Sequence, residues 1–404
     1  MAKKARTARA VIGAGYGDEG KGLMTDWLAS QGADVVVRTN GGAQAGHTVE
    51  NGGSRHVFHH FPSGSAAGVP GHLSRHFVSH PMLFGGERAE LLAKGWSTRL
   101  TADPRGLVTT PWDMMVNQFI EVRRGNARHG SCGVGFGETI ERSLRDRFLI
   151  SVGDVLSGAD VRGRLLAIRN DWVPERLKAL GGGELSPEEA SLVSDDGILE
   201  AYLADCEAFA ASVTVLEDRA LRGAVLFEGA QGLMLDQEYG SFPHVTRSYT
   251  GVRNMSEVAA EAGIGKIEAL YATRAYVTRH GAGPLGHEGE PMDHVRIVDP
   301  TNAPNEWQGT IRAAPLDVDV LAAAIARDLA QARMGVKASA SLAVTCVDQV
   351  HGSLLLWSGG KRERVPAEML ACRIGSLAGY GVEAVSRGPS RGDVSSAGTV
   401  ARAA

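Results

Sequence analysis

Short apolar runs that end in glycine-containing loops recur along this chain, and between them lie segments in which apolar residues repeat with a helical period. Apolar runs bounded by glycine are typical of buried strands, and a repeat of about 3.6 residues is typical of amphipathic helices. The apolar runs predict strands at residues 8–12, 33–37, 224–227, 267–277 and 342–347. The periodic segments predict helices at residues 22–30, 198–213 and 317–329.

The repeated order of strand, glycine loop and helix predicts an α/β fold with a mostly parallel central sheet and flanking helices. Ligands of such sheets bind beyond the carboxyl ends of the strands. We expect residues 1–404 to form a single large P-loop-like domain with helical and loop excursions. Residues 1–7 are expected to be a flexible tail, and residues from about 160 to 215 a helical excursion without chemical motifs.

Composition excludes several classes of protein. Hydrophobic residues make up 43% of the 404 residues, enough for a sizeable core. A net charge of −4 gives no reason to expect a nucleic acid or membrane partner, and no apolar run reaches the length of about 18 residues that a membrane span needs. The four cysteines are scattered without a CxxC pair, which favours a reduced, cytoplasmic enzyme over a disulfide scaffold or a zinc site.

The first chemical motif is GAGYGDEGKG, residues 13–22, between a predicted strand and a predicted helix. Its spacing matches a phosphate-binding loop, except that Gly22 stands where a Mg²⁺-binding hydroxyl is usual. In this setting Lys21 would neutralise phosphate oxygens at the helix N-terminus. Asp18, inside the loop, is a candidate Mg²⁺ ligand and general base. The alternative is a glycine-rich turn with a surface lysine.

The second motif is GGAQAGHT, residues 41–48, which follows the second predicted strand. Small residues precede His47, so a substrate can approach its imidazole closely. Because both loops lie at the same edge of the sheet, we expect His47 to act near the phosphates as a general acid. The alternative is a structural histidine.

With EGAQG, VTRHGAGP and SRGPSR further along, these motifs resemble those of the adenylosuccinate synthetase family in order and in span. The family transfers the γ-phosphate of GTP to the 6-oxygen of a purine nucleotide, and the amine of aspartate then displaces that phosphate. The resemblance implies that Asp18 removes the N1 proton and binds Mg²⁺. It also implies that His47 is the acid, that the Gly46 carbonyl binds Mg²⁺ and that Lys21 binds phosphate.

The resemblance also implies the rest of the site. It implies contacts with the substrate nucleotide, a purine nucleoside monophosphate, from Gln44, Ser131, Cys132, Arg145, Gln231, Thr246 and Arg279, where Gln231 is also catalytic and Glu228 supports it. It implies contacts with the donor nucleotide from Glu19, Gly20, Lys21, Gly22, Gly46, Thr48, Asp348, Ser386, Gly388 and Pro389. The family forms homodimers in which an arginine crosses the interface, and Arg142, Arg145 and Arg147 are the candidates for it here.

The chain departs from the family pattern mainly around the substrate. Ser131 and Cys132 replace a threonine pair, Gln44 replaces an asparagine and Tyr16 replaces a tryptophan. The aspartate loop keeps only Arg312 in register, so Arg312 with Thr310 is the expected aspartate site.

The guanine-reading K-x-D of the family becomes residues 346–348, which makes ATP as well as GTP a candidate donor. Asp348 is the guanine acceptor that remains.

Departures in the pocket around unaltered catalytic residues favour a changed substrate. A bacteriophage branch of the family joins aspartate to dGMP, and such an enzyme would work in the host cytoplasm. We expect IMP or GMP/dGMP as the substrate, with a small preference for the 2-amino purine. A P-loop switch without ligase activity is the alternative from another class, and a dinucleotide-binding dehydrogenase fits less well because Lys21 interrupts the required glycine pattern.

Overall fold

The computed structural model describes residues 6–125, 128–299 and 310–396. Strand β1 (Arg6–Gly13) begins earlier than expected, so the predicted tail of residues 1–7 is wrong for its last two residues. The Arg6 guanidinium donates hydrogen bonds to the carbonyls of Leu221, Gly223 and Ala262, which fixes the start of the strand. Residues 1–5 lie outside the described part.

A ten-stranded sheet runs through the molecule in the order β19-β18-β15-β11-β1-β10-β2-β5-β7-β9. Its pairs are parallel except β18 with β19, so the prediction of a mostly parallel sheet is confirmed. The other strands of this sheet are β2 (Val35–Arg38), β5 (Gly71–Leu73), β7 (Leu100–Ala102), β9 (Thr214–Val215), β10 (Val225–Gly232), β11 (Ile264–Arg274), β15 (Lys337–Thr345), β18 (Val382–Ser386) and β19 (Val394–Ser396).

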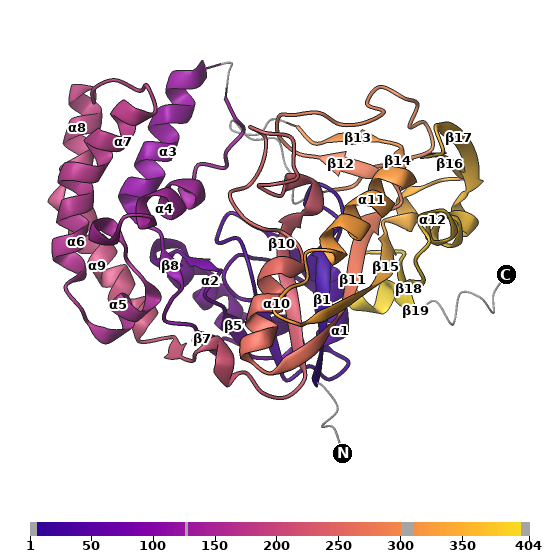
Figure 1. The fold of residues 1–404 in the computed structure, drawn as a ribbon, viewed down its shortest axis with the longest axis horizontal. Coiled ribbons are helices and arrows are strands. Elements are labelled where there is room, and N and C mark those ends of the chain that lie inside the picture. Colours follow the sequence, from indigo (N-terminus) through magenta and orange to yellow (C-terminus); the bar gives the residue numbers. More distant parts are fainter. Residues whose placement is uncertain (1–5, 126–127, 300–309, 397–404) are drawn as a thin grey trace.

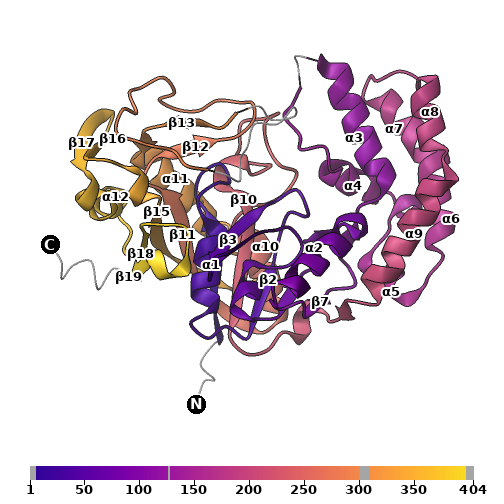
Figure 2. The same cartoon turned by 180° about the vertical axis from the view of Figure 1, so that it is seen from behind.

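Helices cover both faces of the sheet (Figures 1 and 2). Ala8, Ala10 and Ile12 of β1 pack in one apolar cluster with α10 (Val252–Glu261), α11 (Val318–Leu329) and α12 (Leu370–Ala378). Val11, which points to the opposite face, packs with α1 (Lys21–Ala29). Burial on both faces explains why these strands read as continuous apolar runs rather than as alternating patterns.

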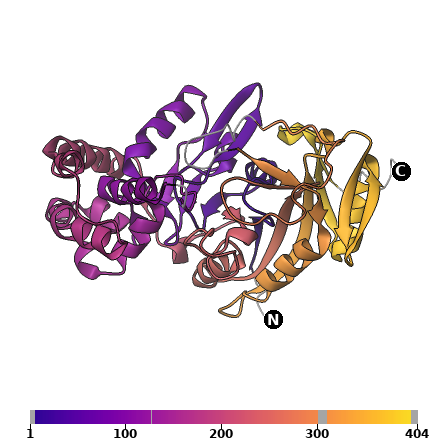
Figure 3. The same cartoon turned by 90° about the horizontal axis from the view of Figure 1, so that it is seen from above.

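A helical lobe lies at one end of the molecule (Figure 3). It includes the expected excursion, residues 160–215, but begins earlier, because α3 already belongs to it. Its helices are α3 (Pro111–Arg124), α4 (Phe136–Ser143), α5 (Val152–Ser157), α6 (Val161–Ala167), α7 (Val173–Ala179), α8 (Pro187–Val193) and α9 (Asp196–Ala210), and α2 (Pro81–Ala93) packs against it. The chain returns to the sheet through β9.

Smaller sheets complete the described part. The hairpin of β3 (His47–Asn51) and β4 (Ser54–Phe58) begins with the last two residues of the second motif. The others pair β6 (Val78–Ser79) with β8 (Leu107–Val108), β12 (Val277–Arg279) with β13 (Arg312–Ala314), and β16 (Ser353–Ser358) with both β14 (Leu316–Asp317) and β17 (Lys361–Pro366). Among the described residues, no helix combines the length and apolarity needed to cross a bilayer.

Candidate active site

The turn between β1 and α1 is held by its own side chains. The Glu19 carboxylate accepts the N–H groups of Gly15 (2.9 Å) and Gly17 (2.7 Å) and forms an ion pair with Lys21 (2.8 Å). The Lys21 ammonium also donates to the Gly17 carbonyl (2.6 Å), and its side chain is almost fully buried. The interpretation of Lys21 as a surface lysine is therefore wrong. In this structure the Glu19 carboxylate neutralises the positive charge of Lys21, the charge that would otherwise bind a phosphate.

Packing explains the glycine that replaces the Walker hydroxyl. A Cβ at Gly22 would come within 2.6 Å of the Thr48 carbonyl and within 3.2 Å of the His47 Cβ. Any side chain at this position would therefore push β3 away from the first turn of α1. Gly22 lets the second motif lie directly against the P-loop-like turn.

A cleft of about 650 Å³ opens beside this turn. That volume lies within the range of pockets for nucleotide-sized ligands, roughly 300–1,000 Å³. Many of the expected site residues line it, namely Asp18, Gln44, Gly46, His47, Ser131, Cys132, Gln231, Thr246 and Arg279. The structure thus brings together, from loops far apart in the sequence, most of the residues assigned to the substrate and to catalysis.

His47 forms a buried pair with Glu228. The distance from His47 Nδ1 to Glu228 Oε1 is 2.7 Å, and Glu228 also accepts the backbone N–H (3.0 Å) and the hydroxyl (2.5 Å) of Ser63. Nδ1–H therefore donates to the carboxylate, while Nε2 is buried and has no partner among the described residues. His47 as a residue lines the cleft. Burial lowers the pKa of His47 to about 4, against the opposing effect of Glu228.

Arg38 adds a positive charge to this pair. It is fully buried and lies beside Glu228 in the parallel register of β2 with β10. Burial acts to raise the pKa of Glu228, but His47 and Arg38 lower it below its usual value, so Glu228 is a carboxylate. Sequence reasoning missed Arg38, although a charged residue at the end of a buried strand was the available signal.

Asp18 and Gly46 lie in the same cleft wall. Burial raises the pKa of Asp18, opposed mainly by the positive charge of Arg274, whose guanidinium donates to the Asp18 carbonyl (2.5 Å). A carboxylate and a backbone carbonyl are oxygen donors of the kind that Mg²⁺ prefers, and Mg²⁺ is usually held by one or two carboxylates with phosphates and water. The donor set present therefore fits this ion.

Two glutamines that line the cleft have buried polar atoms without a partner among the described residues. These atoms are both amide atoms of Gln44 and Oε1 of Gln231. Gln231 also has a left-handed backbone, with φ of 56°. Such a conformation is uncommon outside glycine, and backbone strain of this kind clusters at functional sites. These observations support the prediction that both glutamines contact a ligand.

The loop that carries Ser131 and Cys132 is anchored to α3. The hydroxyl of Ser131 donates to Asn117 Oδ1 (2.8 Å). The buried carboxylate of Glu121 accepts the N–H groups of Gly130 (3.2 Å) and Ser131 (3.4 Å). Burial raises the pKa of the Cys132 thiol, so it stays protonated near neutral pH. Asn117 and Glu121, which sequence reasoning missed, follow one another at helical spacing on α3.

Arg279 belongs to the cleft wall, but its donors are engaged. They reach the carbonyls of Ala282 (3.0 Å), Pro284 (2.8 Å) and His244 (3.2 Å), and the guanidinium lies 4.5 Å from the centre of the Tyr16 ring. In this state Arg279 shapes the loop around the cleft rather than offering free donors. Its predicted contact with the substrate nucleotide stays a prediction.

The expected aspartate residues lie outside the residues that line this cleft. Arg312 pairs with Glu288 (2.7 Å) and donates to the carbonyls of Gly281 and Gly283 (both 2.8 Å), and Thr310 is exposed. Residues 300–309, the remainder of that loop, lie outside the described part.

The three arginines proposed for the dimer interface differ. Arg142 is fully buried and bonded to Asp113 (2.8 Å), so it has a structural role within its own chain. Arg145 and Arg147 are exposed on the helical lobe, where they pair with Glu175 and Asp171. Within one chain, Arg145 does not line the cleft; its predicted contact across an interface stays a prediction.

The expected donor-nucleotide residues from the C-terminal part of the chain lie at the ends of two neighbouring strands. Asp348 follows β15 and is exposed, while Ser386 ends β18 and donates its hydroxyl to the Gly388 carbonyl (2.7 Å), next to the exposed Pro389. The Thr345 hydroxyl donates to the Glu19 carbonyl (2.9 Å), which joins β15 to the P-loop-like turn. Gly20 has φ of 84°, and a Cβ there would lie 3.3 Å from Thr345. The ends of β15 and β18 therefore adjoin the P-loop-like turn that contains Lys21.

The fold and the cleft define an α/β protein with a P-loop-like turn and a buried His–Glu pair. A family model described as adenylosuccinate synthetase matches residues 10–306. The chain therefore belongs to the adenylosuccinate synthetase family.

Curated relatives include the adenylosuccinate synthetases of Anaeromyxobacter dehalogenans strain 2CP-1 (35% identity over 287 residues) and Neisseria gonorrhoeae strain FA 1090 (34% over 289 residues). Each alignment covers 69% of this chain and 64% of the relative, so the matched region spans slightly less than two thirds of these proteins.

Two solved structures share the fold over nearly the whole chain. The fully ligated adenylosuccinate synthetase of Plasmodium falciparum superposes with a TM-score of 0.69 at 18% identity, covering 96% of this chain and 99% of that one. The succinoaminodeoxyadenylate synthetase of cyanophage S-2L, bound to dGMP and dATP as an energy donor, gives a TM-score of 0.60 at 16% identity and covers 99% of both chains.

Proposed function

We propose that this protein is a ligase that joins L-aspartate to C6 of a 6-oxopurine nucleoside monophosphate through a 6-phosphoryl intermediate, with GTP or ATP as the phosphoryl donor. The observation that carries the proposal is the cleft in which Asp18 and the unpartnered Nε2 of His47 lie beside the P-loop-like turn. Family membership supports the same chemistry.

In the first step, Asp18 accepts the N1 proton of the purine, so that the 6-oxygen becomes a nucleophile. N1–H is a weak acid, and a carboxylate whose pKa is raised by burial is a stronger base than an ordinary aspartate. Gln231, at the end of β10, orients the purine through its open amide oxygen. Asp18 and Gly46 would hold Mg²⁺, which would offset the charge of the transferring phosphoryl group.

His47 serves the phosphoryl group through Nε2. In the unliganded chain its lowered pKa keeps the imidazole neutral at physiological pH, with a lone pair on Nε2. A phosphoryl group at Nε2 favours the protonated form, because nearby negative charge raises the pKa of an imidazole. Glu228 holds Nδ1–H, so the proton that His47 gives or takes is the one on Nε2. The 6-oxygen bonds to the γ-phosphorus of the donor while the bond from that phosphorus to the nucleoside diphosphate breaks. Aspartate's amine then bonds to C6 and gives up a proton, while the C6–O bond breaks and phosphate leaves.

For the substrate we propose a 2-amino-6-oxopurine monophosphate, dGMP or GMP, used at least as well as IMP. An exocyclic amine needs an acceptor, and the open oxygens of Gln44 and Gln231 supply acceptors in the cleft. A buried amine without a partner costs about 1–3 kcal/mol, enough to exclude the substrate roughly 5- to 150-fold. Neutral drift in an enzyme that uses IMP is the competing explanation of the same departures.

Aspartate would bind through Arg312 and Thr310, and a homodimer would bring Arg145 of a second copy to the nucleotide. Arg312 can offer a bidentate contact to a carboxylate only if it releases Glu288 or one of its backbone carbonyls. The donor nucleotide would lie along Lys21, Asp348 and Ser386.

The test is to incubate the protein with IMP, GMP or dGMP, each with GTP or ATP and Mg²⁺, and to follow product by mass spectrometry with and without L-aspartate. A succinylated nucleotide that forms only with aspartate supports the ligase. Nucleoside triphosphate hydrolysis that ignores aspartate would instead identify a P-loop switch. A kcat/KM for IMP more than about tenfold above that for dGMP would show that the pocket rejects the 2-amino group.

A further inference from the structure

Arg247 lies at the border between the two sides of the cleft. It follows Thr246 in the loop between β10 and α10, and residues 243–247 all line the cleft. Its Nη2 lies 2.6 Å from Oε2 of Glu141, which belongs to α4 of the helical lobe. This ion pair therefore connects the sheet side of the cleft to the helical side.

Three arginines of the described part line the cleft, and they differ in how their donors are used. Arg279 is buried and bonded to three backbone carbonyls, and Arg124 pairs with the buried Glu121 (2.7 Å). The side chain of Arg247 is 45% exposed, and its partner Glu141 is 25% exposed. Arg247 is thus the cleft arginine whose contact is with an accessible carboxylate rather than with a buried group.

The loop that carries Gly130 and Ser131 also lines the cleft, and donors of both residues are engaged within the protein. Its N–H groups at Gly130 and Ser131 point to the Glu121 carboxylate, and the Ser131 hydroxyl points to Asn117. The Glu121 carboxylate is in turn paired with Arg124 (2.7 Å). A guanidinium from another part of the cleft wall would add the charge-assisted donors that this loop does not leave free.

For Arg247, exchange of the Glu141 carboxylate for a phosphate group is energetically favourable. Ion pairs between accessible side chains contribute little, because water competes for both groups. A phosphate dianion offers two oxygens to the planar guanidinium and forms two parallel charge-assisted hydrogen bonds.

We infer that Arg247 binds the 5′-phosphate of the substrate nucleotide from within the same chain, and that it exchanges Glu141 for this phosphate when the nucleotide enters. The inference rests on the proposed function and names a phosphate ligand in addition to the arginine expected from a second copy. Because Glu141 holds Arg247 in the unliganded chain, the two residues have opposite effects on nucleotide affinity.

The test compares a monophosphate with its nucleoside by equilibrium binding. Arg247→Met should raise Kd for IMP and dGMP about 10- to 100-fold, as expected for a lost charge-assisted contact. It should leave Kd for inosine, deoxyguanosine and the triphosphate donors unchanged. The matched control is Arg162→Met, which removes an exposed ion pair with Glu200 far from the cleft and should alter none of these values.

The Glu141→Gln variant distinguishes two roles of Arg247: a ligand of the phosphate, or a structural contact that only holds the two sides of the cleft together. If the inference holds, this variant binds the monophosphates as well as the wild type or more tightly, because Arg247 is released. If it weakens their binding as Arg247→Met does, the pair only fixes the two lobes and the inference is overturned. Equal losses for nucleoside and monophosphate in Arg247→Met would also overturn it.

One further variant and one measurement on the wild type complete the test. Arg247→Lys keeps the charge but not the planar fork, so it should bind monophosphates with an affinity between those of the wild type and Arg247→Met, even if the methionine variant does not fold. The proposed function fails separately, if the wild-type protein forms no succinylated product. An unchanged monophosphate Kd in an active Arg247→Met enzyme would refute only the role of Arg247.

Discussion

Two buried imidazole–carboxylate pairs lie in different regions of this molecule. His47 and Glu228 lie 2.7 Å apart beside the cleft, and His72 of β5 and Asp218 lie 2.9 Å apart away from it. In the first pair the second imidazole nitrogen, Nε2, is buried and has no partner among the described residues. In the second pair the remaining nitrogen, Nδ1, bonds to the Thr101 hydroxyl (2.9 Å).

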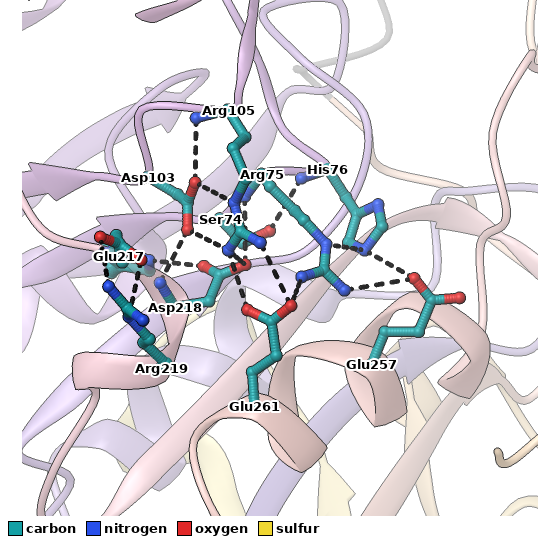
Figure 4. A network of polar contacts seen from close by, with 11 residues as sticks. Ser74, Arg75, His76, Asp103, Arg105, Glu217, Asp218, Arg219, Glu257 and Glu261 are labelled. Carbon is teal, nitrogen blue, oxygen red and sulfur yellow. Dashed lines mark hydrogen bonds and ion pairs between the residues drawn. The ribbon is translucent and has the colours of Figure 1, made fainter. Parts of the chain in front are cut away.

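The surroundings of the two pairs also differ in whether their polar groups have partners. Asp218 belongs to an arginine–carboxylate network in which charged side chains from loops after β5 and β7 meet the end of α10 (Figure 4). Arg105 bonds to Asp103 (2.7 Å) and to Glu261 (2.8 Å), and Arg75 pairs with Glu257 and Glu261. Around His47, in contrast, Gln44 and Gln231 also leave polar atoms open.

The contrast teaches that a buried ionic pair is a candidate for a reaction site when it leaves a polar atom without a partner in a residue that lines a cavity. Both regions place polar side chains after parallel strands, where ligand sites are expected. In the network every strong charge meets an opposite charge of the protein, which leaves a ligand nothing to bind. In the cleft, unsatisfied buried groups are costly without a ligand, and a ligand that satisfies them gains the corresponding free energy.

The largest expected effect on kcat comes from a substitution in the cleft. Asp18→Asn should lower kcat by about 10³-fold or more, because an amide cannot accept the N1 proton, and should leave the affinity for the purine monophosphate largely intact. Steady-state kinetics and calorimetric binding measure the two quantities. A variant that keeps more than about a tenth of the wild-type kcat would remove Asp18 from the chemistry.

The two histidines compare the pairs directly. His47→Asn should lower kcat by about 10²- to 10⁴-fold, as expected for a positioned acid–base group. His72→Asn, the matched control, should leave kcat unchanged and reduce the free energy of unfolding by about 1–3 kcal/mol, because Asp218 loses a buried partner. Urea unfolding and steady-state assays of both variants decide the matter. A similar loss of activity in both would mean that the open nitrogen of His47 is not what distinguishes the cleft.

A substitution of Arg312 tests whether a guanidinium that is already bonded to Glu288 and to loop carbonyls can still bind aspartate. Arg312→Leu should raise KM for aspartate by roughly two orders of magnitude, because a charge-assisted bidentate contact contributes about 1.5–3 kcal/mol. KM for both nucleotides should barely change. If aspartate KM stays the same, the contacts of Arg312 with Glu288 and the loop carbonyls are its whole function, and the aspartate site lies elsewhere.

The arginine–carboxylate network should affect stability rather than turnover. Burial acts to raise the pKa of Asp103, but the Arg105 side chain and the N–H groups of Asp218 and Arg105 outweigh it and hold the pKa at about 2. A depressed pKa contributes stability that is present above the unfolded value, 3.8, and is lost as pH falls towards 2. Wild-type unfolding should therefore become easier over this acidic range.

Arg105→Met removes one source of that pH dependence. We expect it to reduce the free energy of unfolding at neutral pH by about 1–2 kcal/mol, a value discounted because Arg105 is partly exposed. The loss of stability on acidification should be smaller than in the wild type, and kcat should be unchanged. Urea unfolding at pH 7 and at about pH 2.5, within the range where the Asp103 contribution is lost, measures these quantities. A reduced kcat in a folded variant would show that the network contributes to the reaction.

The sequence by itself determined the central strands β1, β2, β10, β11 and β15, the helices α1, α9 and α11, and the loops in which we propose the catalytic residues lie. Strand β1, helix α1 and helix α11 lie within two residues of the predicted bounds, because apolar periodicity and glycine positions act locally. The motifs around Asp18 and His47 were recognisable because close backbone approach and strand-to-helix turns restrict which residues fit.

Only the tertiary structure decided which charged side chains pair with one another. The sequence could not indicate that Glu19 neutralises Lys21, that Arg312 points to Glu288 or that Arg142 is buried against Asp113. Nor could it show that Gly22 is required by the Thr48 carbonyl or that Arg247 meets Glu141 across the cleft. Periodicity and turn chemistry depend on neighbours in the chain. The partner of a long, flexible cation depends instead on groups that only folding brings within about 4 Å, where a Coulomb interaction is strong enough to choose among them.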